Sequence, residues 1–409
     1  MRMRIALAVE GTRGDVHPML ALGDRLRARG HEIVVCAPPD FAADTQAHGF
    51  AFHPVGRAAR ETLDEVAEAV VKGGLRMLRA ANGYVEGALR AQFEVLPDAT
   101  SGAHLIIGAG VQMAGASAAE RHGVAYRYIA YVPTLLPSAE HAPFLLPLPR
   151  LPRWGNRLAW WLMMRGYDAM LRGPFTRERA ALGLGPVRNV LAHFTTDHPL
   201  LAADPELAPV PADQRDRTTV IGCLHPLDGP DLPAKLESFL ESGPPPVYLG
   251  FGSMTDTDAA GTTALLLRAI ELVGCRALVS EGWAGLGQQP LPEGVLAIGS
   301  VSHARLFPRM AAIVHHGGAG TTTNAARAGV PQIVVPHLFD QIYWGERVSA
   351  LGLGPPQIRR TRLSAEGLAA ALREVLENEV IQERAQTLAG RLAAWRAQAG
   401  DPARHFDLD

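Results

Sequence analysis

One acidic side chain, Asp15, stands where a base for proton transfer would be useful. It lies in the stretch AVEGTRGDVHP (residues 8–18), directly after the first hydrophobic run, where a strand is expected to give way to a helix. Aspartate is among the best helix N-caps, because its carboxylate accepts hydrogen bonds from the N–H groups of the first turn. The same carboxylate can act as a general base that takes a proton from a hydroxyl group. The sequence therefore offers two interpretations of Asp15, a cap and a catalytic base.

The residues around Asp15 decide between these interpretations. A cap at Asp15 would bond the N–H groups of His17 and Pro18, but proline has no N–H, so one usual donor is missing. Arg13 and the positive end of the helix dipole favour the ionised carboxylate that a base needs, and they keep that base weak. His17 is expected to be peripheral, because residues i and i+2 point to different sides of a helix. We therefore interpret Asp15 as the general base.

A second reactive feature is a glycine-rich turn in the stretch AAIVHHGGAGTTTNAARAGVPQIVVPHLFDQIYWGERV (residues 311–348). AAIVHH is typical of a buried strand and a helix is expected to begin near Thr321, so Gly317, Gly318 and Gly320 fall in the turn between them. Backbone N–H groups in such a turn converge on an anion, and the helix N-terminus adds its positive dipole end. The alternative is a turn whose glycines only permit tight packing. Two histidines before the turn and two threonines after it favour a diphosphate as the ligand.

Two short patterns resemble metal sites, but their local context argues against a bound metal. A literal D-x-D occurs at Asp256, Thr257 and Asp258, but both acids precede a helix, where capping and the helix dipole favour carboxylates. His315 and His316 have no partner at the usual zinc spacing. We therefore expect no metal site, and no cofactor beyond a nucleotide-sugar co-substrate.

The elements that would position these residues alternate between strands and helices in each half of the chain. In the first half, strands are predicted for residues 5–9, 32–38, 104–110 and 125–132, and a helix ends at Gly30. The second half restarts at a strand over 246–254 and continues with strands over 276–280, 294–301, 311–316 and 331–337. Each half opens with a strand and a glycine loop, which is typical of a doubly wound α/β domain.

Length supports two such domains, because a chain of 409 residues exceeds the usual size of one hydrophobic core. We expect an N-terminal domain over residues 1–225 and a linker over 226–245, where proline, glycine and charged residues gather. A C-terminal domain is expected over 246–380. The remaining segment, 381–409, is predicted as a helix that could pack back on the N-terminal domain.

Composition narrows the class of partner. The 39 Lys and Arg nearly balance the 41 Asp and Glu, which gives no electrostatic basis for nucleic-acid binding. The three cysteines are far apart and odd in number, so they form neither a disulfide framework nor a metal motif, and a reducing cytoplasm fits best. No run approaches the ~18 apolar residues that a membrane helix needs. We expect a cytoplasmic protein that binds small molecules.

The stretch HHGGAGTT, followed by GVPQ and then DQ, resembles the donor-binding signature of family 1 nucleotide-sugar glycosyltransferases. GTRGDVHP is similar to the amino-terminal signature of the branch that includes sterol and bacterial natural-product glycosyltransferases. The resemblance covers most of the chain and is weakest from about residue 55 to 100 and across the proline-rich segment. It implies the GT-B fold, two facing Rossmann-like domains with a cleft between them, with the acceptor bound in the first and the donor in the second.

The resemblance also implies roles for individual residues. His316 and the glycine turn would contact the donor diphosphate, Asp340 and Gln341 would hold sugar hydroxyls, and Ser253 would bind phosphate. His303 falls beside the nucleotide in related enzymes, with a solvent-exposed helix start as the alternative. Asn324 stands where some members have a glutamate that grips the ribose, so UDP and dTDP both stay open. The implied donor-binding residues are Thr12, Arg13, Gly252, Ser253, Trp283, Val301, His303, His316, Gly318, Gly320, Thr321, Asp340 and Gln341.

The acceptor side is defined least by the sequence. A proline-rich segment over residues 133–153 precedes an aromatic and methionine-rich helix, which together offer Phe144, Trp154 and Trp160 as an apolar acceptor lining. The alternatives are a packed helix with snorkelling arginines, or a peripheral contact with a membrane that holds a lipid acceptor.

By the resemblance, the chain is an inverting, metal-independent glycosyltransferase. It would move a hexose or deoxyhexose from a UDP- or dTDP-sugar to a hydroxyl of an apolar acceptor, such as a polyketide, macrolide, sterol or lipid. Two rival functions stay open, a sugar-nucleotide epimerase and a non-catalytic nucleotide-sugar-binding protein.

Overall fold

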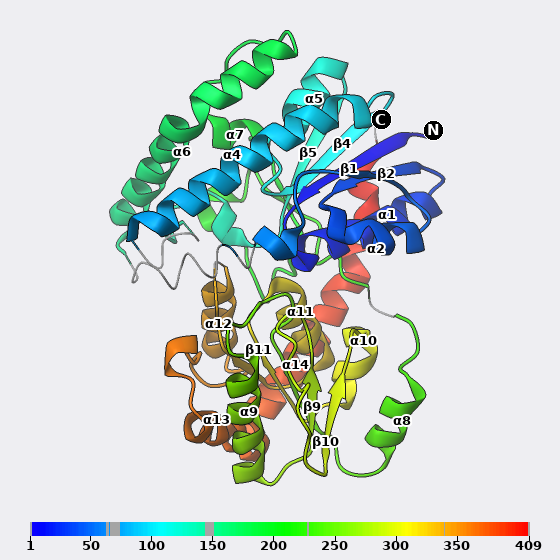
Figure 1. Cartoon of the computed structure of the whole chain (residues 1–409), viewed down its shortest axis with the longest axis vertical. Helices are drawn as coiled ribbons and strands as arrows, with labels where there is room; N and C mark the ends of the chain where they lie inside the picture. The colour runs from blue at the N-terminus through cyan, green and yellow to red at the C-terminus, as the bar shows by residue number, and fades with distance from the viewer. Residues whose placement is uncertain are drawn as a thin grey trace. The chain divides into compact units, whose positions relative to one another are not determined.

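The computed structural model describes residues 2–62, 65, 74–143, 151–226, 229–338 and 340–407, without the side chains of residues 74–82. The chain divides into two compact units, each of which is described by itself (Figure 1). Unit 1 comprises Met1–Ala203, Val210–Leu224 and Asp401–Asp409, and unit 2 comprises Asp204–Pro209 and His225–Gly400. Among the helices so described, none is long and apolar enough to cross a membrane.

Unit 1 is built on a parallel sheet whose described strands lie in the order β3-β2-β1-β4-β5-β6-β7. Ile5 of β1 lies opposite Ile33 of β2 on one side and Leu105 of β4 on the other. The chain therefore builds the sheet outward from β1 in one direction and then in the other. The topological switch point, where ligands bind in such folds, lies between the ends of β1 and β4. The strands are β1 (Arg4–Glu10), β2 (Glu32–Ala37), β3 (Ala51–Pro54), β4 (Leu105–Gly110), β5 (Ala125–Ala130), β6 (Leu200–Leu201) and β7 (Thr219–Val220).

Helices pack against the sheet of unit 1. In Figure 1, α4 runs alongside α6, and α4 contacts both α5 and α6. The apolar run of β1 is fully buried and contacts α1, which explains why it has no alternating polar residues. The described α-helices are α1 (Arg13–Ala28), α2 (Ala42–Ala47), α4 (Gly74–Ala99), α5 (Gly115–His122), α6 (Arg153–Ala181) and α7 (Val190–Thr195).

Unit 2 repeats the scheme with a smaller parallel sheet, in the strand order β10-β9-β8-β11-β12. Its switch point lies between β8 and β11. A core of apolar side chains from β8, β11 and β12 packs against α9 and α13. The strands are β8 (Val247–Gly250), β9 (Ala277–Ser280), β10 (Val295–Ile298), β11 (Ala312–His315) and β12 (Gln332–Val334). The α-helices are α8 (Ala234–Glu241), α9 (Ala259–Val273), α10 (His303–Leu306), α11 (Ala319–Ala328), α12 (Gln341–Ala350), α13 (Ala365–Glu377) and α14 (Glu379–Ala399).

Every strand predicted from an apolar run is confirmed, within a few residues at its ends. The doubly wound α/β class is also confirmed, because all the described strand pairs are parallel. The sequence did not predict β3, β6 and β7, or the long helix α4. Two of these strands are only two residues long, too short to carry a hydrophobic pattern.

The predicted domain boundaries place one crossing between the two halves of the chain, whereas the observed units exchange further segments near residue 204 and at the C-terminus. The expected linker over residues 226–245 contains α8 and belongs to unit 2. The segment Asp204–Pro209 also belongs to unit 2, where the Asp204 carboxylate pairs with Arg327 of α11 at 2.9 Å. The final helix α14 packs against α11 in unit 2, and only the residues from Asp401 onward join unit 1, where η6 (Pro402–Phe406) contacts α1.

Candidate functional site

The predicted diphosphate turn lies at the switch point of the unit 2 sheet. β8 and β11 are neighbours, with His315 opposite Gly250, so the loops that follow the two strands meet. Gly252 has a φ of +59°, and a Cβ there would lie 2.8 Å from Cε1 of His316. Ser253, which follows, is 7% exposed. Two glycine loops that are far apart in the sequence therefore form one site.

Each glycine of the turn permits a close approach that a side chain would block. Gly317 has a φ of +90°, and a Cβ there would lie 2.8 Å from the backbone oxygen of Gln341. A Cβ at Gly318 would lie 2.5 Å from Nε2 of His316, and one at Gly320 would lie 2.0 Å from Nε2 of His225. Tight packing alone requires glycine at these positions, so packing and anion binding are compatible roles for the same residues.

The helix α11 begins at Ala319, two residues before the predicted start at Thr321. The first N–H groups of a helix have no intrahelical partner, and the N-cap here, Gly318, has no side chain to accept from them. Thr321 is thus in the first turn, and the Asn324 amide donates to the backbone oxygen of Gly320 at 2.9 Å. The turn and the helix N-terminus together present N–H groups suited to a phosphate.

His316 is held as a neutral imidazole at this site. Burial, together with the nearby His315, His337 and His303, lowers the pKa of His316 well below its usual range. The ring is 8% exposed, and among the described residues its buried Nδ1 has no hydrogen-bond partner. The neighbouring His315 has a different role, because its Nε2 lies 3.0 Å from Oε1 of Gln332 and its Nδ1 accepts the N–H of Gly317. His315 braces the turn, while His316 is the histidine suited to a ligand.

Asp340 and Gln341 are adjacent in sequence and differ in environment. Gln341 is 4% exposed; its Oε1 accepts the N–H groups of His337 and Leu338, and its Nε2 donates to Sδ of Met254. Asp340 is partly exposed, and its carboxylate accepts from Nε1 of Trp344 at 3.0 Å. Its partial burial raises the pKa of Asp340 to about 6, against the hydrogen bond from Trp344, which lowers it. The sugar-binding role of both residues stays a prediction, and the contacts favour Asp340 for it.

Three more predicted donor-binding residues follow strands β9 and β10. The backbone N–H of Trp283 donates to the oxygen of Gly252 at 2.9 Å, which ties the loop after β9 to the glycine loop after β8. Val301 is partly buried against the apolar core of this unit. His303 begins α10, but its ring stacks on Phe307 at 4.2 Å between centroids, and burial lowers the pKa of His303 to about 4. His303 is therefore a helix-start residue, as the alternative holds, but it is partly buried, and its role beside the nucleotide stays a prediction.

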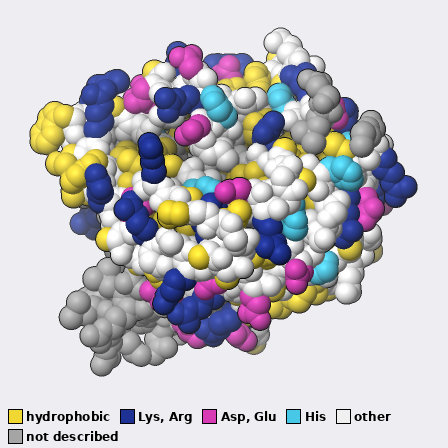
Figure 2. Space-filling model, turned by 90° about the horizontal axis from the view of Figure 1, so that it is seen from above, with side chains coloured by type: hydrophobic (Ala, Val, Ile, Leu, Met, Phe, Trp, Pro, Cys, Tyr) yellow, Lys and Arg dark blue, Asp and Glu magenta, His cyan; other side chains and the backbone are white. Residues whose placement is uncertain are grey.

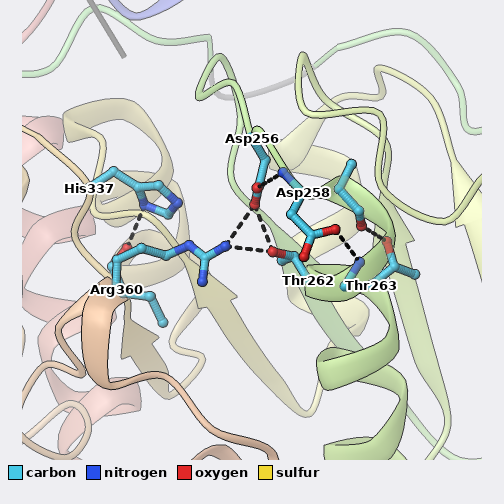
Figure 3. Close-up of polar contacts among 9 residues, drawn as sticks. Asp256, Asp258, Thr262, Thr263, His337 and Arg360 are labelled. Carbon is cyan, nitrogen blue, oxygen red and sulfur yellow. Dashed lines mark hydrogen bonds and ion pairs between the residues drawn. The ribbon is translucent and has the colours of Figure 1, made fainter. Parts of the chain in front are cut away.

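Both aspartates of the D-x-D pattern form hydrogen bonds with other residues of unit 2. The Asp256 carboxylate accepts from the guanidinium of Arg360 at 2.8 Å and from the hydroxyl of Thr262 at 2.7 Å (Figure 3). Asp258 is the N-cap of α9 and accepts from the N–H of Gly261, as predicted for a capping residue. Among the residues described, no three acidic, histidine or cysteine side chains form a group that could hold a metal ion.

At the switch point of unit 1, the structure corrects the cap interpretation of Asp15. The helix α1 begins at Arg13 and its N-cap is Thr12, whose Oγ1 accepts from the N–H of Gly14. Asp15 is the third residue of the helix, and its Oδ2 accepts the N–H of Thr12 at 2.8 Å, which completes a capping box. The missing N–H of Pro18 therefore does not bear on the cap, because the cap lies three residues earlier than expected.

Other contacts around Asp15 fix its backbone and its neighbours. A Cβ at Gly11, whose φ is +151°, would lie 2.1 Å from Oδ2 of Asp15. The Tyr131 hydroxyl donates to the backbone oxygen of Asp15 at 2.8 Å. His17 lies 3.0 Å from a carboxylate oxygen of Asp44, through its Nε2. Asp15 itself is partly exposed at the helix N-terminus.

The structure adds two residues that the sequence did not predict. Glu10, the last residue of β1, is a buried carboxyl beside Asp15. A glutamate at the end of an apolar run is the signal that could have found it. His225 packs against Gly320 of the diphosphate turn. It immediately precedes the stretch expected to be a linker, so nothing in its local pattern points to the site.

The residues proposed to line the acceptor site have different environments. Trp154 is 70% exposed at the start of α6, whereas Trp160 is 3% exposed and donates from Nε1 to the backbone oxygen of His141. Phe144 lies outside the described residues. Figure 2 shows hydrophobic side chains beside Lys and Arg side chains at its left edge, where α6 lies in Figure 1. Trp160 is therefore a packed residue, as the alternative interpretation holds.

Comparison with known proteins places these features in a family. Residues 5–136 match the glycosyltransferase family 28 N-terminal domain, and residues 277–398 match the erythromycin biosynthesis protein CIII-like C-terminal domain. Glycosyltransferase GtfE of Amycolatopsis orientalis is 39% identical over 95% of this chain and 93% of its own length. The dTDP-epi-vancosaminyltransferase of that organism is 33% identical over 94% of this chain and 93% of its own length. The crystal structure of glycosyltransferase VinC in complex with dTDP has a TM-score of 0.69 at 22% identity, covering 99% of this chain and 98% of VinC.

Proposed function

The chain belongs to the family 1 nucleotide-sugar glycosyltransferases of GT-B fold, and we propose that it transfers a hexose or deoxyhexose from a dTDP-sugar to a hydroxyl of an apolar natural product. The main support for this proposal is that the loop of Ser253 lies against His316 and the glycine turn, at the switch point between β8 and β11. The N–H groups at the start of α11, which have no intrahelical partner, and a neutral imidazole are suited to a diphosphate. The dTDP donor is proposed because one relative carries that nucleotide in its name and VinC was solved with it.

In the proposed reaction, Asp15 takes the proton of the acceptor hydroxyl. The acceptor oxygen forms a bond to the anomeric carbon while the bond from that carbon to the diphosphate oxygen breaks, and the electron pair leaves with dTDP. The N–H groups at the start of α11, with His316, would stabilise the charge that develops on the diphosphate. A single displacement inverts the anomeric carbon and uses no metal, and Asp256 is already held by Arg360.

Asp15→Asn tests this function. The amide oxygen can still accept the Thr12 N–H, so the capping box and the fold should be preserved. Asparagine cannot take a proton, so we expect transfer to fall at least ~100-fold, the typical contribution of a general base, with unchanged dTDP affinity. Transfer is measured by mass spectrometry with panels of dTDP-sugars, UDP-sugars and hydroxylated apolar acceptors, and dTDP affinity by calorimetry.

The matched control is Asp44→Asn, which removes another partly exposed carboxylate of unit 1. It should transfer sugar at the normal rate. Normal turnover of Asp15→Asn would refute its role as the base. Turnover of UDP-sugars alone would refute the dTDP donor and leave the base assignment in place.

A further inference from the structure

Glu10 is a buried carboxyl to which the proposed reaction assigns no role. It ends β1, two residues before Thr12, the N-cap of the helix α1 that contains Asp15, and it is 5% exposed. Its backbone oxygen accepts the N–H of Val111 at 3.0 Å. Glu10 therefore lies at the carboxyl end of β1, where β1 and β4 form the switch point. A glutamate among the apolar residues of a parallel strand is costly to bury, so its surroundings must compensate for that cost.

Two neutral donors from α4 hold the Glu10 carboxyl in place. The Tyr84 hydroxyl donates to Oε1 at 3.2 Å, and Nε2 of Gln92 donates to Oε2 at 3.4 Å. Gln92 is itself fixed, because its Nε2 also donates to the oxygen of Val111 and its Oε1 accepts the N–H of Met113. The orientation of the Gln92 amide is therefore set by the backbone, and it presents a donor to Glu10.

Glu10 and Asp15 approach each other at the end of β4, where a Cβ at Gly110 would lie 2.0 Å from the backbone oxygen of Glu10 and 3.4 Å from Oδ1 of Asp15. Burial raises the pKa of the Glu10 carboxyl to about 7; hydrogen bonds from Gln92 and Tyr84 lower it, and the negative charge of Asp15 raises it further. Burial raises the pKa of the Tyr84 phenol, and the charges of Glu10 and Asp15 raise it further. Burial raises the pKa of Tyr128 and of Tyr131, and the charge of Asp15 raises both further. Tyr167 also raises the pKa of Tyr84 and of Tyr128. Among the described residues, the titratable groups around the acid pair include tyrosines from α4, β5, the segment after β5 and α6.

We propose that Glu10 is a positioning residue for Asp15, whose carboxylate, held at the end of β1 by Tyr84 and Gln92, strengthens Asp15 as a proton acceptor. The proposal rests on the assignment of Asp15 as the general base. A negative charge near a carboxylate makes that carboxylate bind a proton more tightly. Asp15 alone, at a helix N-terminus with its Oδ2 bonded to the Thr12 N–H, is a weak base. The charge of Glu10 offsets that weakness.

The consequence is a pH dependence that Asp15 alone would not give. Below about pH 7 Glu10 is protonated and Asp15 is a weaker base, so transfer is slow. As the pH rises through this value, Glu10 ionises and the rate rises. We expect the ionisation of Glu10 to raise the rate roughly three- to tenfold, because a stronger base holds more of the transferred proton in the transition state.

The test is the pH profile of kcat/KM from pH 5 to 9 for the wild type and three variants. Glu10→Gln keeps the hydrogen-bonding shape without a charge. It should abolish the rise near pH 7 and lower the plateau above pH 8 roughly three- to tenfold, without changing the KM for the donor. Tyr84→Phe removes a hydrogen bond that stabilises ionised Glu10, so the rise should move to higher pH. Glu32→Gln, an exposed glutamate at the start of β2, should leave the wild-type profile.

The outcomes separate this proposal from the base assignment. A Glu10→Gln profile that keeps its rise near pH 7, or falls uniformly at every pH, would overturn the role of Glu10. A rise that does not move in Tyr84→Phe would overturn it as well, and this second variant decides the matter if Glu10→Gln fails to fold. Loss of activity in Asp15→Asn together with either result would show that Asp15 is the base and that Glu10 does not act on it.

Discussion

His316 is the side chain from which we expect the largest single contribution to donor binding. Its pKa is lowered by burial, so the imidazole is neutral, and its ring packs against both Gly252 and Gly318. A neutral imidazole in that position can form one hydrogen bond with a charged phosphate oxygen. Because such bonds contribute about 1.5–3 kcal/mol, His316→Ala should bind dTDP roughly ten- to a hundredfold more weakly, measured by calorimetry. His17→Ala, in the other unit and bonded to Asp44, is the control and should bind dTDP normally; equal affinity of the two variants would refute the role of His316.

Neighbouring residues show how far the sequence could specify the site. The sequence pattern picked out Asp340 and Gln341 as a pair, but only the structure shows that the Gln341 amide is bonded to the backbone of His337 and Leu338. The direction in which a side chain leaves the start of a helix depends on the preceding loop, and no local pattern specifies that loop. The same holds for Glu10, whose role depends on α4, a helix much later in the chain that the sequence did not predict.

At the scale of elements, the diphosphate turn depends on a backbone that only glycine adopts readily. Gly317→Ala would place a Cβ 2.8 Å from the Gln341 oxygen, at a φ of +90° that L side chains rarely adopt. We expect a loss of about 1–3 kcal/mol in stability, because the strain falls on the loop itself, together with weaker dTDP binding. Thermal unfolding and calorimetry measure the two effects.

The control for this substitution is Gly390→Ala in α14, where a Cβ would meet nothing within 4 Å. Alanine is the better helix former, so Gly390→Ala should be as stable as the wild type or slightly more so. If Gly317→Ala behaved in the same way, the strained turn would not be needed for the site.

The sequence predicted elements better than it predicted their ends. Buried parallel strands are continuous apolar runs, and each such run became a strand, as 311–316 became β11. The predicted start of α1 is wrong by three residues, because Asp15 is a strong N-cap residue but serves here as the third helical residue of a capping box that begins at Thr12. Both glycine loops were found because their strands precede them directly, and their meeting in space follows from β8 and β11 being neighbours.

At the scale of the whole molecule, the path of the chain between units was not predictable from composition. Proline and glycine mark turns wherever they occur, so the stretch after His225 resembled a linker although it contains α8. Asp204 forms an ion pair with Arg327 in unit 2. No local sequence pattern around either residue predicts this pairing. The last residues of the chain, from Asp401 onward, belong to unit 1, and no local sequence pattern predicts this either.

Because the residues from Asp401 onward belong to unit 1, we expect them to contribute to the stability of that unit. Phe406 is 1% exposed in η6, which contacts α1, and the neighbouring Asp407 pairs with Arg29 of the segment that follows α1. Phe406→Ala should therefore destabilise unit 1 by about 3–5 kcal/mol, the usual cost of deleting a buried phenylalanine. Calorimetric unfolding with and without dTDP identifies the transition of unit 2, because a ligand raises the melting temperature of the unit that binds it. In Phe406→Ala the transition that dTDP does not shift should move to lower temperature.

The matched control is Val380→Ala, a substitution in the same C-terminal region at a side chain that is 52% exposed and lies in α14 of unit 2. Removing two methyl groups from an exposed valine should change neither transition by more than about 0.5 kcal/mol. If Phe406→Ala instead lowered the transition that dTDP raises, the C-terminal segment would stabilise unit 2, and its assignment to unit 1 would be wrong. With the expected result, the last residues of the chain hold the unit that carries Glu10 and Asp15, although the preceding helix belongs to the unit that carries the diphosphate turn.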